Sequence, residues 1–373
     1  MKWLFWFSVL LVVYTYVGYP LWLYLRSRSL AKAVRPSGDF FPAISIVMAV
    51  HNECETLPRK LRNLAELDYP ADRCEIVIVS DGSTDATNEI LAAHADERTR
   101  VFNVPQRQGK AGALNRGIQA AKGEIIVFTD ARPLIARDAV KYLVANFDDP
   151  SVGCVCSDIG LGDPESGASV NGLGLYWRIE TNVRRWEGAT GSLVGAAGCL
   201  YAVRRNLVVP LPAATILDDM YIPLHVARQG SKVMFDPRAR GWDRAQSDRR
   251  REFRRKVRTL TGNYQLLQLA PWLLTRQNPV RFQFVCHKVL RLLVPFALAG
   301  MLVSSLVLHQ GFYTLALIAQ AAFYGLASLA VLRLKRGIVY RLADVSLAFL
   351  VLNTAAVVAL LYFVTGKKQV WVR

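Results

Sequence analysis

Cysteine and histidine are scarce in this chain of 373 residues, which has six cysteines and five histidines. No two cysteines form a C-x-x-C pair, and no histidines accompany them at the spacing of zinc ligands. Cys154 and Cys156 alternate along a strand-like run, so we expect both to be buried as free thiols. The pattern argues against a disulfide framework and against a structural zinc site.

Charge is missing from four long stretches, which are Trp3–Leu25, Leu292–Leu308, Phe312–Leu332 and Val345–Gly366. A helix that crosses a bilayer needs roughly 20 predominantly apolar residues, and these stretches suit that length. Single polar residues such as Gln320 and Asn353 are tolerable where membrane helices pack together. A small transporter is disfavoured because no charged residue inside the stretches marks a pathway. We predict an integral membrane protein with about four transmembrane helices.

Basic residues beside the apolar stretches predict an orientation. Two groups flank them: Arg26, Arg28, Lys32 and Arg35 after the first stretch, then Arg333, Lys335, Arg336 and Arg341 between the last two. If the four helices alternate, the positive-inside rule places both groups in the cytosol and the N-terminus outside. The tail departs mildly from this rule through Lys367, Lys368 and Arg373. We expect a multi-pass protein of a bacterial-type inner (plasma) membrane whose middle region is cytosolic.

The formal net charge is +17, and the segment Arg238–Arg258 contributes ten Lys or Arg residues to it. Apolar residues recur there at helical spacing, at Phe253, Val257, Leu260, Tyr264 and Leu267. Arginines fill most of the remaining surface, at Arg250, Arg251, Arg254, Arg255 and Arg258. The pattern predicts an amphipathic helix that lies at the membrane interface or packs on the globular domain. Nucleic-acid binding is disfavoured for a protein with four membrane spans.

Strand and helix signals alternate from about Pro42 to Pro150. The predicted strands are Ile44–Val50, Glu75–Val79, Arg100–Val104 and Glu124–Thr129. Helical segments separate them, which implies a mostly parallel sheet whose ligands bind beyond the carboxyl ends of the strands. Those ends carry His51-Asn52-Glu53, Asp81 and Asp130. We therefore predict a ligand site on this rim, although an Asp-Gly turn is the alternative use of Asp81.

Two further segments carry candidate site residues. Lys110 begins a predicted helix among Gly109, Ala111 and Gly112, small residues that let a diphosphate approach backbone amides. A solvated surface lysine is the alternative reading. Asp218-Asp219 begins a later helix, where the pair could cap the helix or point a carboxylate into a pocket.

Six stretches occur in a set order: ISIVMAVHNE, VSDGSTD, GKAGALNRG, FTDA, GAAGCLYAVRR and LDDM. In this order the sequence resembles the membrane-bound inverting family 2 glycosyltransferases, which include cellulose, hyaluronan and chitin-oligosaccharide synthases. The likeness covers roughly Pro42 to Gly262. It implies an α/β domain of GT-A type, which is a nucleotide-sugar-binding fold with a mostly parallel sheet and flanking helices. Here that domain would be joined to the four transmembrane helices.

The resemblance also implies roles for single residues. Asp219, with Asp218 beside it, matches the catalytic general base that takes the proton of an acceptor hydroxyl. Asp130 matches the first acid of a D-x-D motif and would hold Mg²⁺ or Mn²⁺. The implied nucleotide-binding positions are Ala49, His51, Glu53, Asp81, Lys110, Asn115 and Asp130.

Two departures from the family pattern concern the diphosphate and the acceptor. Arg132 stands in place of the second acid of D-x-D, where it could contact the diphosphate directly. The stretch Arg255–Thr259 occupies the place of a QxxRW motif that helps bind the acceptor and the donor phosphate. Arg258 is retained there, whereas glutamine and tryptophan are not. Arg132, Arg255 and Arg258 are thus the candidates for diphosphate or acceptor contacts.

We expect an N-terminal transmembrane helix over 1–28 and a cytosolic GT-A domain over 40–247. Amphipathic interface helices are expected over 248–286, and three transmembrane helices over 287–373. The expected function is inverting transfer of a sugar from a nucleotide sugar, most often a UDP-sugar, to a lipid-linked or glycan acceptor in polysaccharide or glycolipid biosynthesis. The alternatives are a processive synthase that extrudes its product and an inactive sugar-nucleotide-binding scaffold. Membrane lipid is an expected partner, nucleic acid is not, and oligomerisation stays open.

Overall fold

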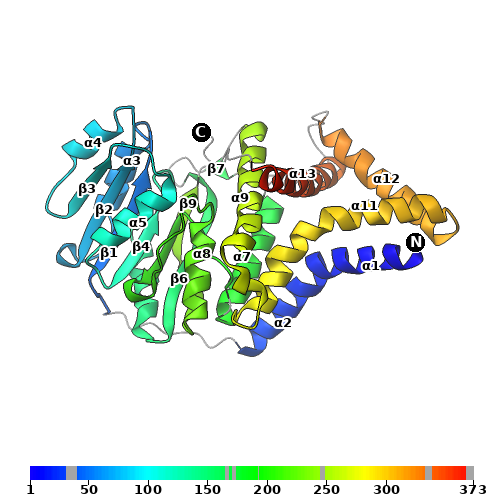
Figure 1. Ribbon diagram of the computed structural model, residues 1–373, viewed down its shortest axis with the longest axis horizontal. Coiled ribbons are helices and arrows are strands. Elements are labelled where there is room, and N and C mark those ends of the chain that lie inside the picture. Colours follow the sequence, from blue (N-terminus) through cyan, green and yellow to red (C-terminus); the bar gives the residue numbers. More distant parts are fainter. Residues whose placement is uncertain are drawn as a thin grey trace.

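The molecule has two parts, a sheet with its covering helices and a bundle of long helices beside it (Figure 1). The computed structural model describes residues 1–30, 40–163, 168–169, 174–191, 193–243, 248–331 and 338–366. Many basic residues behind the predicted orientation lie outside the described residues, namely Lys32, Arg35, Arg333, Lys335, Arg336, Lys367, Lys368 and Arg373. That orientation therefore stays a prediction from the sequence.

Four strands form the parallel half of the sheet, in the order β3–β2–β1–β4. Their bounds are Ile44–Val50 for β1, Cys74–Asp81 for β2, Thr99–Val104 for β3 and Ile125–Thr129 for β4. β1 and β4 are apolar runs with almost every residue buried, as central parallel strands require. The predicted strands agree with these bounds to within two residues, and their carboxyl ends meet at one rim.

The second half of the sheet is mixed. Strand β8 (Leu200–Arg204) runs antiparallel to β4, and β6 (Val152–Asp163) runs antiparallel to β8. Strand β9 (Lys232–Asp243) is parallel to β6, and the short strands β5 (Leu134–Ile135) and β7 (Ala168–Ser169) pair with β9 and β6. The expected α/β fold with flanking helices is confirmed, and the parallel arrangement holds for the half that precedes Asp130. Beyond it, β8 returns against β4 and reverses the strand direction.

Helices pack against this sheet around a single large hydrophobic core. They are α3 (Leu57–Ala65), α4 (Thr87–Ala93), α5 (Lys110–Ala120), α6 (Ala139–Ala145), α7 (Gly174–Ala189) and α8 (Asp218–Arg228). Short 3-10 turns occupy Ala71–Arg73, Asn146–Asp148, Arg205–Leu207 and Pro271–Leu274. Gly117 lets α5 approach β1, because a Cβ there would lie 2.6 Å from Val47 Cγ1. The six cysteines are free thiols, and Cys154 and Cys156 are buried, as predicted.

Four helices among the described residues are long and apolar enough to cross a membrane, which indicates a membrane protein: Lys2–Ser29, Arg281–Leu308, Phe312–Ala330 and Leu342–Val364. The first comprises α1 (Lys2–Val13), a π-helical turn (Tyr14–Gly18) and α2 (Tyr19–Leu30). The second comprises α10 (Arg281–Phe284), a π-helical turn (Val285–Val289) and α11 (Leu290–Leu308). Helices α12 (Phe312–Val331) and α13 (Ile338–Val364) follow. The N-terminus lies at the end of the bundle far from the sheet (Figure 1).

The second of these helices begins at Arg281, before the expected start at 287 and before the charge-free stretch from Leu292, and the polar residues between them are paired. His287 Nδ1 lies 2.8 Å from Glu187 Oε1, and its Nε2 lies 2.9 Å from Glu180 Oε1. Arg291 donates to Glu180 Oε2 at 2.7 Å. Both glutamates belong to α7, so this cluster joins the sheet domain to the bundle. It also places charged residues within a candidate span.

Helix α9 (Arg249–Leu269) carries the predicted amphipathic pattern. Its apolar face packs on α13: Val257 lies in one buried cluster with Ala355 and Ala359, and the rings of Tyr264 and Phe363 stack with centroids 5.9 Å apart. Leu266, further along α9, belongs to the core of the sheet domain. The apolar face is thus covered by protein from both parts of the molecule. A position at the membrane interface stays a prediction.

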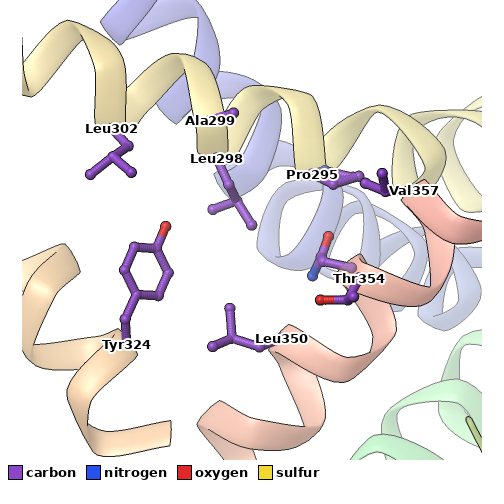
Figure 2. A pocket seen from close by; sticks show the side chains of 9 residues that line it. Pro295, Leu298, Ala299, Leu302, Tyr324, Leu350, Thr354 and Val357 are labelled. Carbon is purple, nitrogen blue, oxygen red and sulfur yellow. The ribbon is translucent and has the colours of Figure 1, made fainter. Parts of the chain in front are cut away.

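A cavity of about 260 Å³ lies among the long helices, away from the rim of the sheet (Figure 2). Residues of α11, α12 and α13 line it: Pro295, Leu298, Ala299, Leu302, Tyr324, Leu350, Asn353, Thr354 and Val357. The lining is largely apolar, and it includes none of the predicted site residues.

Candidate active site

Three elements bring charged side chains together at the rim of the sheet. The ammonium of Lys110, at the start of α5, lies 3.0 Å from Asp130 Oδ1 and 3.1 Å from Asp218 Oδ1. Asp130 directly follows β4, and Asp218 begins α8. The backbone of Gly109 adopts a φ of 84°, which starts α5 at the point where Lys110 faces the other two residues. Lys110, Asp130 and Asp218 therefore lie together at the rim, and Asp219 is the next residue of α8.

The charges of this cluster hold Lys110 and Asp130 in their ionised forms. Burial alone would lower the pKa of Lys110, but Asp130, Asp218 and Asp219 together hold it above its usual value. Burial alone would raise the pKa of Asp130, but Lys110 lowers it, and Arg132 and Arg258 add to that effect. The exposed arginines Arg132 and Arg258 therefore lie close enough to act on this carboxylate. An anionic ligand at the rim would meet three cations.

Asp219 has a different environment from its neighbours. Burial and the adjacent Asp218 raise the pKa of Asp219 to about 6, although Lys110 opposes the shift. Its backbone carbonyl accepts a hydrogen bond from Ala196 N at 2.7 Å. Gly198 packs directly on the side chain, since a Cβ at this glycine would lie 2.8 Å from Asp219 Oδ2. A carboxylate with a pKa near neutrality, held by a small-residue loop, suits a general base.

Asp81 fixes the loop that leads into α5. Its Oδ1 accepts a hydrogen bond from Gln108 N at 2.7 Å, and its Oδ2 accepts one from Gly109 N at 2.8 Å. Gly82, with a φ of 61°, allows this approach, because a Cβ there would lie 2.9 Å from Arg107 N. The carboxylate is buried and lies next to the start of α5. It thereby orders the backbone beside Lys110, and both oxygens keep further acceptor capacity.

The other predicted residues of the β1 end lie beside Asp81. His51 Nδ1 is 2.7 Å from the Asp81 carbonyl oxygen, and Ala49 is the penultimate residue of β1. The Glu53 carboxylate accepts a hydrogen bond from Thr56 Oγ1 at 2.7 Å, and Glu53 N donates to Thr87 Oγ1. These contacts tie the turn after β1 to the start of α4. Glu53 remains partly exposed, so a ligand can reach it.

Two predicted residues make other contacts. Asn115 forms a reciprocal pair with Leu211: its Nδ2 donates to the Leu211 carbonyl and its Oδ1 accepts from Leu211 N, both at 2.8 Å. Arg255 lies 3.0 Å from Asp243 and 3.3 Å from Glu252. The amide of Asn115 thus supports the loop before α8, and Arg255 ties α9 to the end of β9. Ligand contacts by these two side chains stay predictions.

Sequence reasoning missed two residues behind the rim. Lys60 of α3 is 1% exposed, and its ammonium donates to Thr129 Oγ1 at 2.9 Å and to the Pro133 carbonyl at 2.8 Å. Burial lowers the pKa of Lys60 to about 7, although Asp130 opposes the shift. The position of Lys60 on the face shared with the buried Leu57 and Leu64 was the available signal. Gly198 was recognisable only as part of a small-residue loop.

Within the described ranges, no group of three or more His, Cys, Asp or Glu side chains is arranged to hold a metal ion. Asp130 and Asp218 nevertheless converge on one cation, the ammonium of Lys110. Carboxylate oxygens are the ligands that Mg²⁺ and Mn²⁺ prefer. The donor set therefore fits a divalent cation that takes part of its oxygen shell from a bound diphosphate.

A family profile described as "Glycosyl transferase family 2" matches residues 45–208. Residues 45–208 form a glycosyltransferase family 2 domain. This family 2 domain includes Asp81, Lys110 and Asp130 of the candidate site. Asp218 and Asp219 lie just beyond the matched stretch and join the site through α8.

Two curated proteins resemble the chain over most of its length. Poly-beta-1,6-N-acetyl-D-glucosamine synthase of Staphylococcus aureus (strain COL) is 26% identical over 273 residues, 70% of this chain and 65% of that protein. "Probable glycosyltransferase YdaM" of Bacillus subtilis (strain 168) is 26% identical over 236 residues, 60% of this chain and 55% of that protein. The chain thus spans 65% and 55% of the lengths of these relatives.

A solved structure shares the fold of the whole chain. The mannosyltransferase PcManGT from Pyrobaculum calidifontis, in complex with GDP-Man and Mn2+, matches with a TM-score of 0.71 and 24% identity. The match covers 98% of this chain and 100% of that one. Together with the family 2 domain, this likeness confirms the expected GT-A type fold with long apolar helices attached.

Proposed function

We propose that this protein is a membrane-bound inverting glycosyltransferase that moves a sugar from a nucleotide sugar to a lipid-linked or glycan acceptor. One observation carries the proposal: Lys110 draws together Asp130 from the end of β4 and Asp218 from the start of α8, with Asp219 beside them. Such a rim suits a reaction in which a diphosphate leaves and a hydroxyl loses its proton. The family 2 domain and the names of both relatives support the same assignment.

Asp219 is the general base in this proposal. It takes the proton of the acceptor hydroxyl as the hydroxyl oxygen attacks the anomeric carbon of the donor sugar. The bond from that carbon to the diphosphate breaks on the opposite face, so the configuration inverts. Because the pKa of Asp219 is raised to about 6, the carboxylate is ionised at neutral pH and still basic enough to accept a proton.

Cations at the rim receive the leaving diphosphate. Lys110 stays protonated, since its pKa is held above the usual value. Arg132 is exposed and acts on Asp130, so it lies where a second positive charge can meet the diphosphate. Asp130 would hold Mg²⁺ or Mn²⁺, which when bound neutralises charge on the leaving group. The likeness to a structure that contains Mn2+ is consistent with a divalent cation.

The nucleotide would occupy the side of the rim formed by β1 and β2. Asp81, His51 and Glu53 lie there, and Asp81 also orders the loop before Lys110. The family resemblance implies a UDP-sugar, whereas the similar structure from Pyrobaculum calidifontis contains GDP-Man. Both nucleotides therefore belong in the first test.

The membrane arrangement completes the proposal. The sheet domain, expected over 40–247, would lie in the cytosol of a bacterial-type cell, where nucleotide sugars are made. The helix α9 would lie close to the inner face of the membrane, since it packs on both α13 and the domain core. Its exposed arginines Arg250, Arg251 and Arg254 would then face anionic lipid headgroups.

A second candidate is a processive synthase that extends and extrudes a polymer. The relative named poly-beta-1,6-N-acetyl-D-glucosamine synthase favours it. The tryptophan of the QxxRW motif is replaced here by Thr259, which offers no ring on which an acceptor sugar can stack. We therefore place single transfer first.

The decisive experiment incubates the detergent-purified protein with UDP-sugars and GDP-sugars, Mn²⁺ and a membrane lipid extract. We expect one donor to release its nucleoside diphosphate and to label a lipid or glycan product, and the Asp219→Asn variant to do neither. Binding of a nucleotide without any transfer would support the scaffold alternative. If the protein binds no nucleotide of the panel, the proposal is refuted.

A further inference from the structure

Lys60 places a buried amino group directly behind the rim. It lies on α3, and its side chain is 1% exposed. The ammonium donates hydrogen bonds to Thr129 Oγ1 at 2.9 Å and to the Pro133 carbonyl oxygen at 2.8 Å. Thr129 is the last residue of β4, and Pro133 follows Arg132. One side chain therefore holds both ends of the short turn that carries Asp130 and Arg132.

The same contacts reach the loop that supports the proposed base. The Thr129 hydroxyl, whose oxygen accepts from Lys60, donates to the Cys199 carbonyl at 3.0 Å. Cys199 follows Gly198, which packs on the Asp219 carboxylate. A chain of hydrogen bonds thus runs from Lys60 to the backbone on which Asp219 rests. Lys60 connects the diphosphate side of the rim with its acceptor side.

Burial of the Lys60 amino group costs free energy. The need to fill space in the core does not explain why a lysine is buried here. Transfer of an amine from water into an apolar interior is unfavourable unless each of its donors is well matched. Both acceptors of Lys60 are uncharged oxygens, and its neighbours on α3 include the buried Leu57 and Leu64. An apolar residue of similar length would fill the same space without a buried charge. The presence of a lysine at this position is therefore best explained by its two hydrogen bonds to the turn.

We propose that Lys60 is a positioning residue that fixes the turn Thr129–Pro133 so that Asp130 and Arg132 meet the diphosphate of the donor. It contacts neither donor nor acceptor. The proposal rests on the proposed function for the identity of the ligand, and on the observed hydrogen bonds for the clamp itself.

The test compares Lys60→Met with Asn63→Ala. Asn63 lies one helical turn further along α3 and forms a reciprocal pair with Ile135, its Nδ2 donating to the carbonyl and its Oδ1 accepting from the amide at 2.8 Å each. Both variants lose hydrogen bonds from α3 to the segment after β4, but only Lys60→Met releases the turn with Asp130 and Arg132. Asn63→Ala therefore controls for a general loss of stability.

The first readout is selectivity for the diphosphate, measured by calorimetry with UDP and UMP, and with GDP and GMP. Lys60→Met should bind the preferred nucleoside diphosphate about tenfold more weakly, the effect of losing charge-assisted hydrogen bonds, with little change for its monophosphate. Asn63→Ala should not change the ratio between the affinities for the nucleoside diphosphate and its monophosphate. An equal loss for diphosphate and monophosphate would show a merely structural role and overturn the proposal.

The second readout needs no nucleotide. Hydrogen exchange resolved to single amides should speed up at Asp130–Arg132 in Lys60→Met and at Ile135 in Asn63→Ala. Unchanged protection at Asp130–Arg132 would refute the clamp, even if the protein bound no nucleotide and the proposed function had failed. Should Lys60→Met not fold, Thr129→Val removes one acceptor of the ammonium and must give the same selective loss.

Discussion

The ammonium of Lys110 lies 3.0 Å from Oδ1 of Asp130, the carboxylate that is expected to hold a divalent cation. A lysine and a metal ion would compete for this oxygen. Arg132, in place of a second acid, adds positive charge and weakens the site for a cation further. Lys110 and Arg132 therefore supply positive charge beside the one carboxylate that the D-x-D resemblance assigns to a metal.

Metal dependence should accordingly be present but weak. We expect activity to require Mn²⁺ or Mg²⁺ at a higher concentration than in an Arg132→Asp variant, which restores a second carboxylate beside Asp130. Titration of activity with each metal checks this, with Arg137→Asp, an exposed charge change in the same segment, as the control. Full activity in excess EDTA would show that Lys110 and Arg132 have replaced the ion.

Removal of the proposed base should separate catalysis from binding. Asp219→Asn is expected to lower transfer about a hundredfold or more while nucleotide affinity stays nearly unchanged. Loss of UDP or GDP binding together with activity, measured by calorimetry, would instead indicate a structural role for Asp219.

The same residue predicts a pH profile. Because the folded-state pKa of Asp219 is raised to about 6, the base is protonated and inactive below that pH and ionised above it. Transfer should therefore fall as pH decreases through about 6, and the residual activity of Asp219→Asn should lack this limb. A profile governed by an ordinary carboxylate, with its fall near pH 4, would contradict the assignment.

A methyl group at Gly198 should displace the base. Its Cβ would lie 2.8 Å from Asp219 Oδ2, so Gly198→Ala must push the carboxylate from its observed position. We expect turnover to drop at least about tenfold with unchanged nucleotide affinity, in keeping with the sensitivity of catalysis to small displacements. Gly325→Ala, whose Cβ would have no heavy atom within 4 Å, should be neutral in the same assay.

The cluster between α7 and the second membrane helix should contribute to stability. Glu180 accepts a hydrogen bond from Arg291 and lies 2.9 Å from His287 Nε2, so Glu180→Gln would leave the part-buried guanidinium of Arg291 without this counter-charge. A loss on the order of 3 kcal/mol is expected, as for other broken buried ion pairs. Thermal unfolding in detergent measures it, and Arg185→Ala, which removes the more exposed pair with Asp158, provides the matched control. An equal loss of stability in both variants would show that the cluster contributes no more than an exposed ion pair.

Product length distinguishes the two candidate enzymes. With Thr259 in place of an aromatic acceptor platform, and few membrane helices to enclose a sugar path, we expect an acceptor to gain one residue or very few. Mass spectrometry of the product at high donor concentration decides the matter. A ladder of long homopolymer would favour the processive synthase.

The local elements and the order of the motifs could be predicted from the residues alone. The strand Ile44–Val50 was predicted with its observed bounds, because an apolar run that stops at a polar His-Asn-Glu has clear ends. The four apolar helices followed from hydropathy, since a span needs only length and composition. Asp81 and Asp130 were found at strand ends, where a parallel sheet places them on one rim, and Lys110 and Asp219 were found at helix starts.

Only the tertiary structure decided which of these side chains meet. Lys110 and Asp218 are far apart in the chain. Their contact depends on the pairing of β8, the strand before α8, with β4 and with β6. Asn115 lies within the GKAGALNRG stretch and Arg255 takes the place of the glutamine of QxxRW, yet the fold gives their polar groups to Leu211 and to Asp243. Lys60 was not singled out from the sequence, and only the packing of α3 places it beneath the turn. The contacts between segments that are distant in the chain depend on how helices and strands pack in three dimensions. The local sequence pattern does not specify this packing, and the packing sets the geometry of the site.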